Sequence, residues 1–96
     1  MQIARVIGSA VSTIKDPKLT GLKLLIVQNA SPSNELVGDP FIAADTVGAG
    51  EGELVMLVEG SSARQTGKTI DSAVDAVIIG ILDSLEVGGD VVFTKS

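Results

Sequence analysis

The sequence predicts a small, mainly β protein in which five or six short strands form a barrel or a sandwich. Two observations carry this prediction. β-Branched and aliphatic residues gather in short runs, and segments rich in glycine, proline or polar residues separate those runs. The length of 96 residues fits a single domain spanning residues 1–96. Phe41 and Phe93 are the only aromatic residues, so the core must be aliphatic.

Four strands are predicted in the first sixty residues. Residues 2–14 carry many β-branched residues and no proline, which predicts a long first strand with a bend or bulge at Gly8. The next three strands are expected at 22–28, at about 41–47 and at 53–59. The segments between them are expected to be a turn region at 15–21, a polar loop at 29–39 and a glycine-rich connection at 48–52.

The last third of the chain is harder to interpret. The polar segment 60–72 has room for a short helical turn, and the stretch 73–87 is ambiguous because its apolar residues have helical spacing. Most of those residues are nevertheless β-branched, and Gly80 lies among them, which favours a strand. Residues 88–90 predict a turn before a short last strand at 91–94.

Several predicted strands are apolar on both faces, in particular at 54–58 and 77–79. A barrel strand with one wet face should instead alternate apolar and polar residues. Something must therefore cover the outer face, and a neighbouring subunit is the simplest cover because so short a chain has little else to offer. The alternative is a cover from within the chain, supplied by the helical segment or by a long loop.

Composition argues against several functional classes. The net charge of −5 repels phosphates, which makes nucleic acid and anionic membranes poor partners. The chain has no cysteine and no histidine, so it lacks thiolate ligands, a cysteine nucleophile and the commonest general base. Lysines and carboxylates remain, but these absences argue against an enzyme, and no metal or cofactor is expected. The start of the chain lacks a signal-peptide pattern and no apolar run approaches the roughly 20 residues of a membrane span, so a cytoplasmic protein is expected.

Two glycine-containing segments allow a nucleotide-binding interpretation. The run at 48–52 matches part of a dinucleotide fingerprint, but its third glycine is misplaced and a strand, not a helix, is expected after it. Residues 67–69 match only the end of a G-x-x-x-x-G-K-[ST] phosphate loop, because position 62 is serine. We favour a hairpin connection at 48–52 that needs positive φ or close backbone approach.

The segment 60–64 places two hydroxyl groups beside a guanidinium. A serine nucleophile would need an adjacent base, and there is no histidine to serve. We favour an N-cap role for Ser61 or Ser62 at the start of a short helical turn, with Arg64 pairing with a carboxylate, for example across an interface. The later carboxylates have no EF-hand spacing and are expected to be solvated: Asp71, Asp75, Asp83 and Glu86.

Two motifs carry a family resemblance. Residues 45–53 read D-x-V-G-A-G-x-G-E, and residues 60–64 read G-S-S-A-R. Together with the first strand, where residues 4–8 read A-R-V-I-G, this order and spacing closely resembles the EutN/CcmL family, the pentameric vertex proteins of bacterial microcompartments. The resemblance extends over nearly the whole chain.

The resemblance implies a β-barrel of oligonucleotide-binding-like (OB-like) topology with one short helix, and a strand over 76–86. It implies a cyclic homopentamer with a narrow axial pore, which fills the fivefold corners that hexameric shell proteins cannot close. The C-terminal residues 88–93 are similar to those of members from catabolic compartments of ethanolamine or propanediol type. The candidate pore or intersubunit contacts are Gly48, Ala49, Gly50, Glu51, Ser61, Ser62, Ala63 and Arg64. The alternative function is an OB-like binding module for a nucleic acid or a small ligand, which would need the basic groove and stacking aromatic residues that this chain lacks.

A first testable prediction concerns Arg64. If its guanidinium pairs with a carboxylate of a neighbouring subunit, Arg64→Glu brings two like charges together and weakens assembly. Native mass spectrometry of the variant measures the effect as a loss of the assembled species. An unchanged oligomer mass would refute this role of Arg64.

Overall fold

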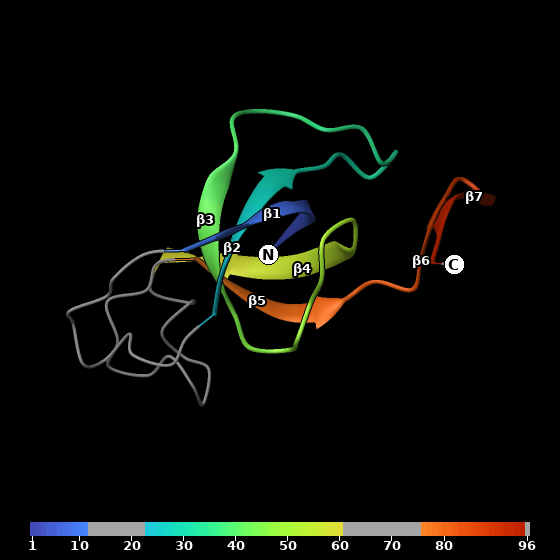
Figure 1. Cartoon of the computed structure of the whole chain (residues 1–96). Coiled ribbons are helices and arrows are strands. Elements are labelled where there is room, and N and C mark those ends of the chain that lie inside the picture. Colours follow the sequence, from blue (N-terminus) through green and yellow to red (C-terminus); the bar gives the residue numbers. More distant parts are fainter. Residues whose placement is uncertain (12–22, 61–75, 96) are drawn as a thin grey trace.

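A computed structural model describes residues 1–11, 23–60 and 76–95 of the chain. The described residues form seven strands: β1 (Gln2–Ala10), β2 (Lys23–Asn29), β3 (Phe41–Asp45), β4 (Leu54–Glu59), β5 (Ala76–Ile81), β6 (Ser84–Val87) and β7 (Asp90–Thr94). The first five close into a barrel in the order β1-β2-β3-β5-β4, and β6 and β7 form a separate two-stranded sheet (Figure 1). The predicted mainly β fold with an OB-like barrel is confirmed.

The bulge expected at Gly8 is present in β1. Val6 is opposite Val27 of β2, but Gly8 is opposite Ile26, so Ile7 is left without a partner in the ladder. A bulge bends a strand and increases its twist. The bend lets Gln2–Arg5 pair with β4 while the strand from Ala4 to Ala10 pairs with β2, which closes the barrel.

The barrel is completed by β5, which lies between β3 and β4. Its pairing with β3 is parallel and short, whereas its pairing with β4 is antiparallel and runs from Ala76 to Ile81. Gly80 is opposite Met56 in that ladder, and a Cβ added at Gly80 would lie only 2.7 Å from the Met56 Cε. The glycine in the middle of this apolar strand therefore leaves room for the Met56 side chain.

The barrel interior is aliphatic, as predicted. Its buried residues are Ala4, Val6, Leu25, Val27, Ala43, Ala49, Val55, Leu57, Ala76 and Ile78. The larger side chains among them are at most 2% exposed, and Phe41 packs against the cluster while remaining partly exposed. A core of this kind is held together by the burial of apolar surface.

The outer face of the barrel carries a second apolar row. Leu24, Ala44, Val77 and Val58 are successive partners across β2, β3, β5 and β4. Because side chains alternate along a strand, Ala44 lies on the face opposite to the core residue Ala43. Ala44 and Val77 are nevertheless at most 1% exposed, so this part of the outer face is covered within the single chain. Ile42 on the same outer face is 54% exposed, so the cover from within the chain does not extend over the whole face.

The ambiguous stretch 73–87 is β-structure where it is described, but it is not one strand. The single strand expected over 76–86 is wrong: β5 ends at Ile81 and β6 begins at Ser84. The chain leaves the barrel here, after the backbone N–H of Leu82 donates to the Leu54 carbonyl. It then folds back on itself at Gly88 and Gly89, whose φ angles of 60° and 87° suit a two-residue hairpin turn.

Two other expectations differ at their ends. The third strand ends at Asp45 and not at Val47, because the Asp45 carboxylate caps the turn that follows. The first strand, expected over 2–14, ends at Ala10, and positions 12–14 lie outside the described residues. The segment 60–72, where a helical turn is expected, also lies outside the described residues except for Gly60.

Candidate functional site

The glycine-rich segment 48–52 connects β3 to β4, and its first part is organised by a buried carboxylate. Asp45 is 7% exposed, and its Oδ1 accepts hydrogen bonds from the backbone N–H groups of Val47 at 3.0 Å and Gly48 at 3.1 Å. Asp45 thus satisfies two donors that the end of the strand would otherwise leave unpaired. Gly48 has a φ of 79°, a conformation that favours glycine at this turn.

The second part of the segment is tied to β1. The N–H of Gly52 donates to the Val6 carbonyl at 2.8 Å, and the N–H of Val6 donates to the Glu53 carbonyl at 2.9 Å. The N–H of Gly50 donates to Glu53 Oε1 at 2.7 Å, which closes a small ring within the loop. The segment 48–52 is therefore fixed across the barrel wall, and it is called the glycine strap below.

This bonding pattern bears directly on the nucleotide-binding interpretation. A phosphate-binding loop presents free N–H groups to its ligand. Here the N–H groups of Gly48, Gly50 and Gly52 are all used inside the protein. The hairpin expected from the sequence is wrong, because β5 lies between β3 and β4 and these two strands do not pair with each other. The expected positive φ is present at Gly48 and Gly52, so the glycines of this segment have a structural role.

The candidate contact residues do not all reach the surface. Gly48 and Glu51 are exposed and Gly50 is partly exposed, but Ala49 is 1% exposed and belongs to the barrel core. Ala49 therefore anchors the loop and leaves its neighbours to face outwards. Residues 61–64, the other candidate contacts, lie outside the described residues.

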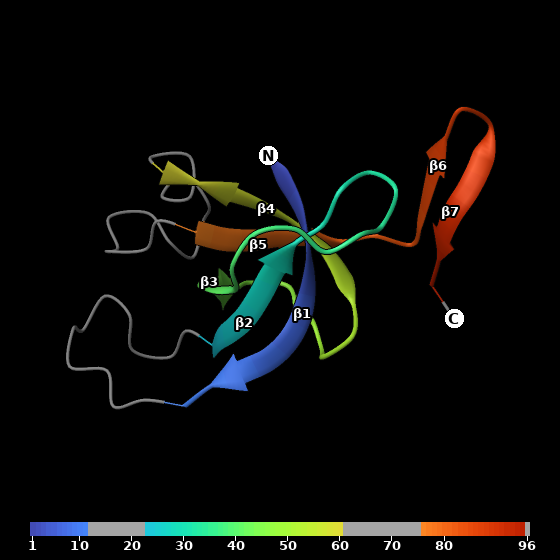
Figure 2. The same cartoon turned by 90° about the horizontal axis from the view of Figure 1, so that it is seen from above.

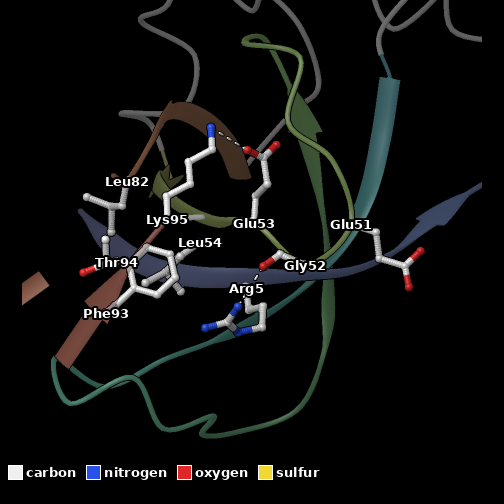
Figure 3. Close-up of a pocket in the computed structure, with 9 residues that line it drawn as sticks. All are labelled: Arg5, Glu51, Gly52, Glu53, Leu54, Leu82, Phe93, Thr94 and Lys95. Atoms are coloured by element: carbon white, nitrogen blue, oxygen red, sulfur yellow. Dashed lines mark hydrogen bonds and ion pairs between the residues drawn. The ribbon is translucent and has the colours of Figure 1, made fainter. Parts of the chain in front are cut away.

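A cleft of about 500 Å³ separates this strap from the β6–β7 hairpin (Figure 3). It is lined by Arg5, Glu51, Gly52, Glu53, Leu54, Leu82, Phe93, Thr94 and Lys95. Sequence reasoning missed Arg5, Glu53 and Lys95 as parts of one site, because they come from three separate regions of the chain. A positively charged residue within an otherwise apolar stretch of the first strand was the available signal for Arg5.

Arg5 lines the cleft and contacts three segments. Its Nη1 donates to the Gly52 carbonyl at 2.7 Å and its Nη2 donates to Asn34 Oδ1 at 2.5 Å. Its Cζ lies 5.7 Å from the centre of the Phe93 ring, within the range of a cation–π interaction.

Glu53 and Lys95 form an ion pair at the other side of the cleft, with 3.0 Å between Lys95 Nζ and Glu53 Oε2. The hydrogen bond from Lys95 holds the pKa of Glu53 below its ordinary value, helped by the N–H of Gly50. The same bond raises the pKa of Lys95 above its ordinary value. An acid catalyst at neutral pH needs the opposite shift of its carboxyl pKa, so Glu53 is poorly suited to that role.

We expect the ion pair to give the protein a small acid-dependent loss of stability. Because the folded-state pKa of Glu53 is lowered, its contribution is present above the unfolded value of 4.5 and disappears as the pH falls through the folded pKa. Glu53→Gln should therefore flatten the fall in melting temperature below that pH, by the modest amount typical of an exposed pair. Glu51→Gln, which removes an exposed carboxylate two residues away, is the control and should leave the fall unchanged.

The remaining chemistry of the described residues is sparse. Across 1–11, 23–60 and 76–95, no three histidine, cysteine, aspartate or glutamate side chains gather as a metal site. None of the helices in that part of the chain has the length and apolar character to cross a membrane. Both aromatic rings are partly buried: Phe41 packs on the core and Phe93 faces Arg5. Each ring therefore already has a contact within the protein, which leaves less of it for stacking on a base.

The fold and its strap define a small OB-like barrel protein whose glycine loop is structural. The chain belongs to the EutN/CcmL family: the family model described as "Ethanolamine utilisation protein EutN/carboxysome" matches residues 1–83. The resemblance seen in the two motifs is thereby confirmed.

Individual relatives agree with this membership. The chain is 47% identical to the bacterial microcompartment shell vertex protein PduN of Salmonella typhimurium, over 88% of this chain and 98% of the relative. It is 44% identical to the shell vertex protein EutN of Escherichia coli K12, over 99% of this chain and 100% of the relative.

Solved structures share the fold. A structure of ethanolamine utilization protein EutN superposes with a TM-score of 0.92 at 44% identity and covers 100% of both chains. The GrpN pentameric microcompartment shell protein of Rhodospirillum rubrum superposes with a TM-score of 0.82 at 42% identity, over 91% of this chain and 99% of that one.

Proposed function

We propose that this chain is a structural shell protein, five copies of which form a ring that closes a vertex of a bacterial microcompartment. The observation that carries the proposal is the 44% identity, over 99% of the chain, to the shell vertex protein EutN of Escherichia coli K12. The pentameric GrpN structure supports a ring of five. A five-membered ring is a closed heterologous assembly, so each copy meets its two neighbours through two different faces.

We assign the shell to the catabolic, ethanolamine- or propanediol-like type. The identities to PduN and EutN are 47% and 44%, against 40% to the carboxysome protein CcmL of Synechocystis. This ordering agrees with the similarity of the C-terminal residues 88–93 to catabolic members.

The proposed mechanism is geometric. Residues 1–96 form a single domain whose copies surround an axial pore and whose rim docks onto hexameric shell proteins. The exposed Gly48 and Glu51, the partly exposed Gly50 and the segment 61–64 are the proposed pore or intersubunit contacts. The protein then works in the cytoplasm as part of the shell, without catalysis, cofactor, nucleic acid or membrane.

Native mass spectrometry of the purified chain tests the ring. The expected dominant species has five times the subunit mass of 9.8 kDa, or about 49 kDa. A monomer at every concentration would overturn the proposal. Mixing the chain with hexameric shell proteins tests the vertex role, because closed shells should be seen by electron microscopy only when the chain is present.

A titration against single-stranded DNA at low salt tests the binding-module alternative. The net charge of −5 and the two engaged phenylalanines predict no binding signal. A saturable signal that weakens with added salt would favour that alternative over a purely structural role.

A further inference from the structure

The β6–β7 hairpin stands away from the barrel in both views of the molecule (Figures 1 and 2). Its two strands pair only with each other, and β5 and β6 are joined by Leu82 and Asp83 alone. An isolated two-stranded hairpin is marginally stable in water. The orientation of this hairpin must therefore be set by side-chain contacts to the barrel and not by a shared sheet.

One such contact is made by the Arg5 guanidinium. The group joins β1 to the Gly52 carbonyl, to the Asn34 side chain and to the Phe93 ring of β7. A guanidinium is planar and holds its donors in a fixed fork, so the three contacts constrain one another. A lysine at this position would supply the charge but not the fork.

The second contact is the ion pair between Glu53 and Lys95, just beyond the end of β7. Its side chains are 24% and 42% exposed, respectively. Ion pairs between exposed, flexible side chains constrain a structure weakly. Lys95 also closes the base of the hairpin, since its N–H donates to the Asp83 carbonyl at 2.7 Å. This pair therefore supports the hairpin, while Arg5 fixes its direction.

We propose that Arg5 is a positioning residue that holds the β6–β7 hairpin in one orientation relative to the barrel. The consequence for assembly rests on the proposed function. The hairpin carries the exposed side chains of Val87 and Val91, at 44% and 61% exposure, and Arg5 determines where they point. A subunit whose β6–β7 hairpin is already oriented loses less conformational entropy when it joins a ring.

Hydrogen exchange measured by mass spectrometry tests the positioning role on the full chain. In Arg5→Ala, peptides covering 84–94 should exchange about tenfold faster, because the hairpin opens more often. Peptides of the barrel core, such as those covering 54–59, should exchange as in the parent. Arg5→Lys should behave like Arg5→Ala, since it lacks the fork, and Lys95→Ala should have the smaller effect. Unchanged exchange of 84–94 in Arg5→Ala would overturn the proposal, and so would full protection in Arg5→Lys.

Phe93→Leu removes the same contact on the side of the hairpin. It is the control for a general folding defect caused by the change at position 5. It keeps an apolar side chain but removes the ring, so faster exchange confined to 84–94 is expected. Faster exchange of the barrel peptides as well, in both variants, would overturn the proposal by showing that the contact stabilises the whole fold.

Native mass spectrometry of the same samples separates this proposal from the proposed function. A pentameric parent with fewer pentamers in Arg5→Ala at equal concentration supports both. A monomeric parent contradicts the proposed ring but not the proposed role of Arg5, because the exchange of 84–94 still reports whether Arg5 orients the hairpin.

Discussion

Leu57→Ala is expected to lower the free energy of unfolding by about 2–5 kcal/mol, the range for removing a fully buried aliphatic side chain. Leu57 is 0% exposed and belongs to the core cluster, with Ile78 of β5 directly opposite. The closed barrel cannot collapse easily around the missing atoms, because β4 is paired on both sides with β1 and β5. The free energy of unfolding of a small domain is about 5–15 kcal/mol in total, so the variant should be close to unfolding at elevated temperature.

Chemical denaturation at a fixed subunit concentration measures this loss, since assembly also stabilises the folded chain. Val11→Ala is the matched control, because it truncates an apolar side chain that is 97% exposed. The free energy of unfolding of this variant should stay within about 0.5 kcal/mol of that of the parent. A loss below about 1 kcal/mol for Leu57→Ala would contradict the view of the barrel interior as a closely packed core.

Strand positions in the barrel were largely predictable because local signals specify them. The runs of β-branched residues placed β1, β2 and β4 to within a few residues, and Gly8 correctly marked the bulge. The end of β3 was missed because it depends on a hydrogen bond from the backbone to Asp45, which a hydrophobic pattern does not report. The break after β5 was missed for a related reason, since apolar residues continue through Leu82 although the ladder ends at Ile81.

The candidate site was less predictable than the fold. The glycine motif correctly pointed to a structural connection, but sequence alone did not reveal that Ala49 faces the core while Glu51 faces outwards. The cleft beside it depends on residues about ninety positions apart, such as Arg5 and Phe93. Only the closed barrel and the projecting hairpin bring such residues together, and no local sequence pattern indicates that they lie close in space.

Asp45→Ala is expected to have the second largest effect, a loss of about 1–3 kcal/mol of stability. The variant removes the acceptor for the N–H groups of Val47 and Gly48 at a position that is only 7% exposed. Two backbone donors then remain unpaired, and donors left without a partner away from water are costly. The turn should loosen as a result. Hydrogen exchange of the amides at 47–50 should then become faster than in the parent, by more than any change in β4.

Asp45→Asn distinguishes this capping role from mere occupation of space. Asparagine keeps the size of the side chain and an Oδ1 that can accept from the same two N–H groups. It should therefore recover at least half of the stability that alanine loses, because the neutral amide oxygen is a weaker acceptor than the carboxylate. Equal losses for the two variants, measured by thermal unfolding at matched concentration, would contradict the capping role. In that case the negative charge of Asp45, and not its geometry as an acceptor, would hold the start of the glycine strap in place.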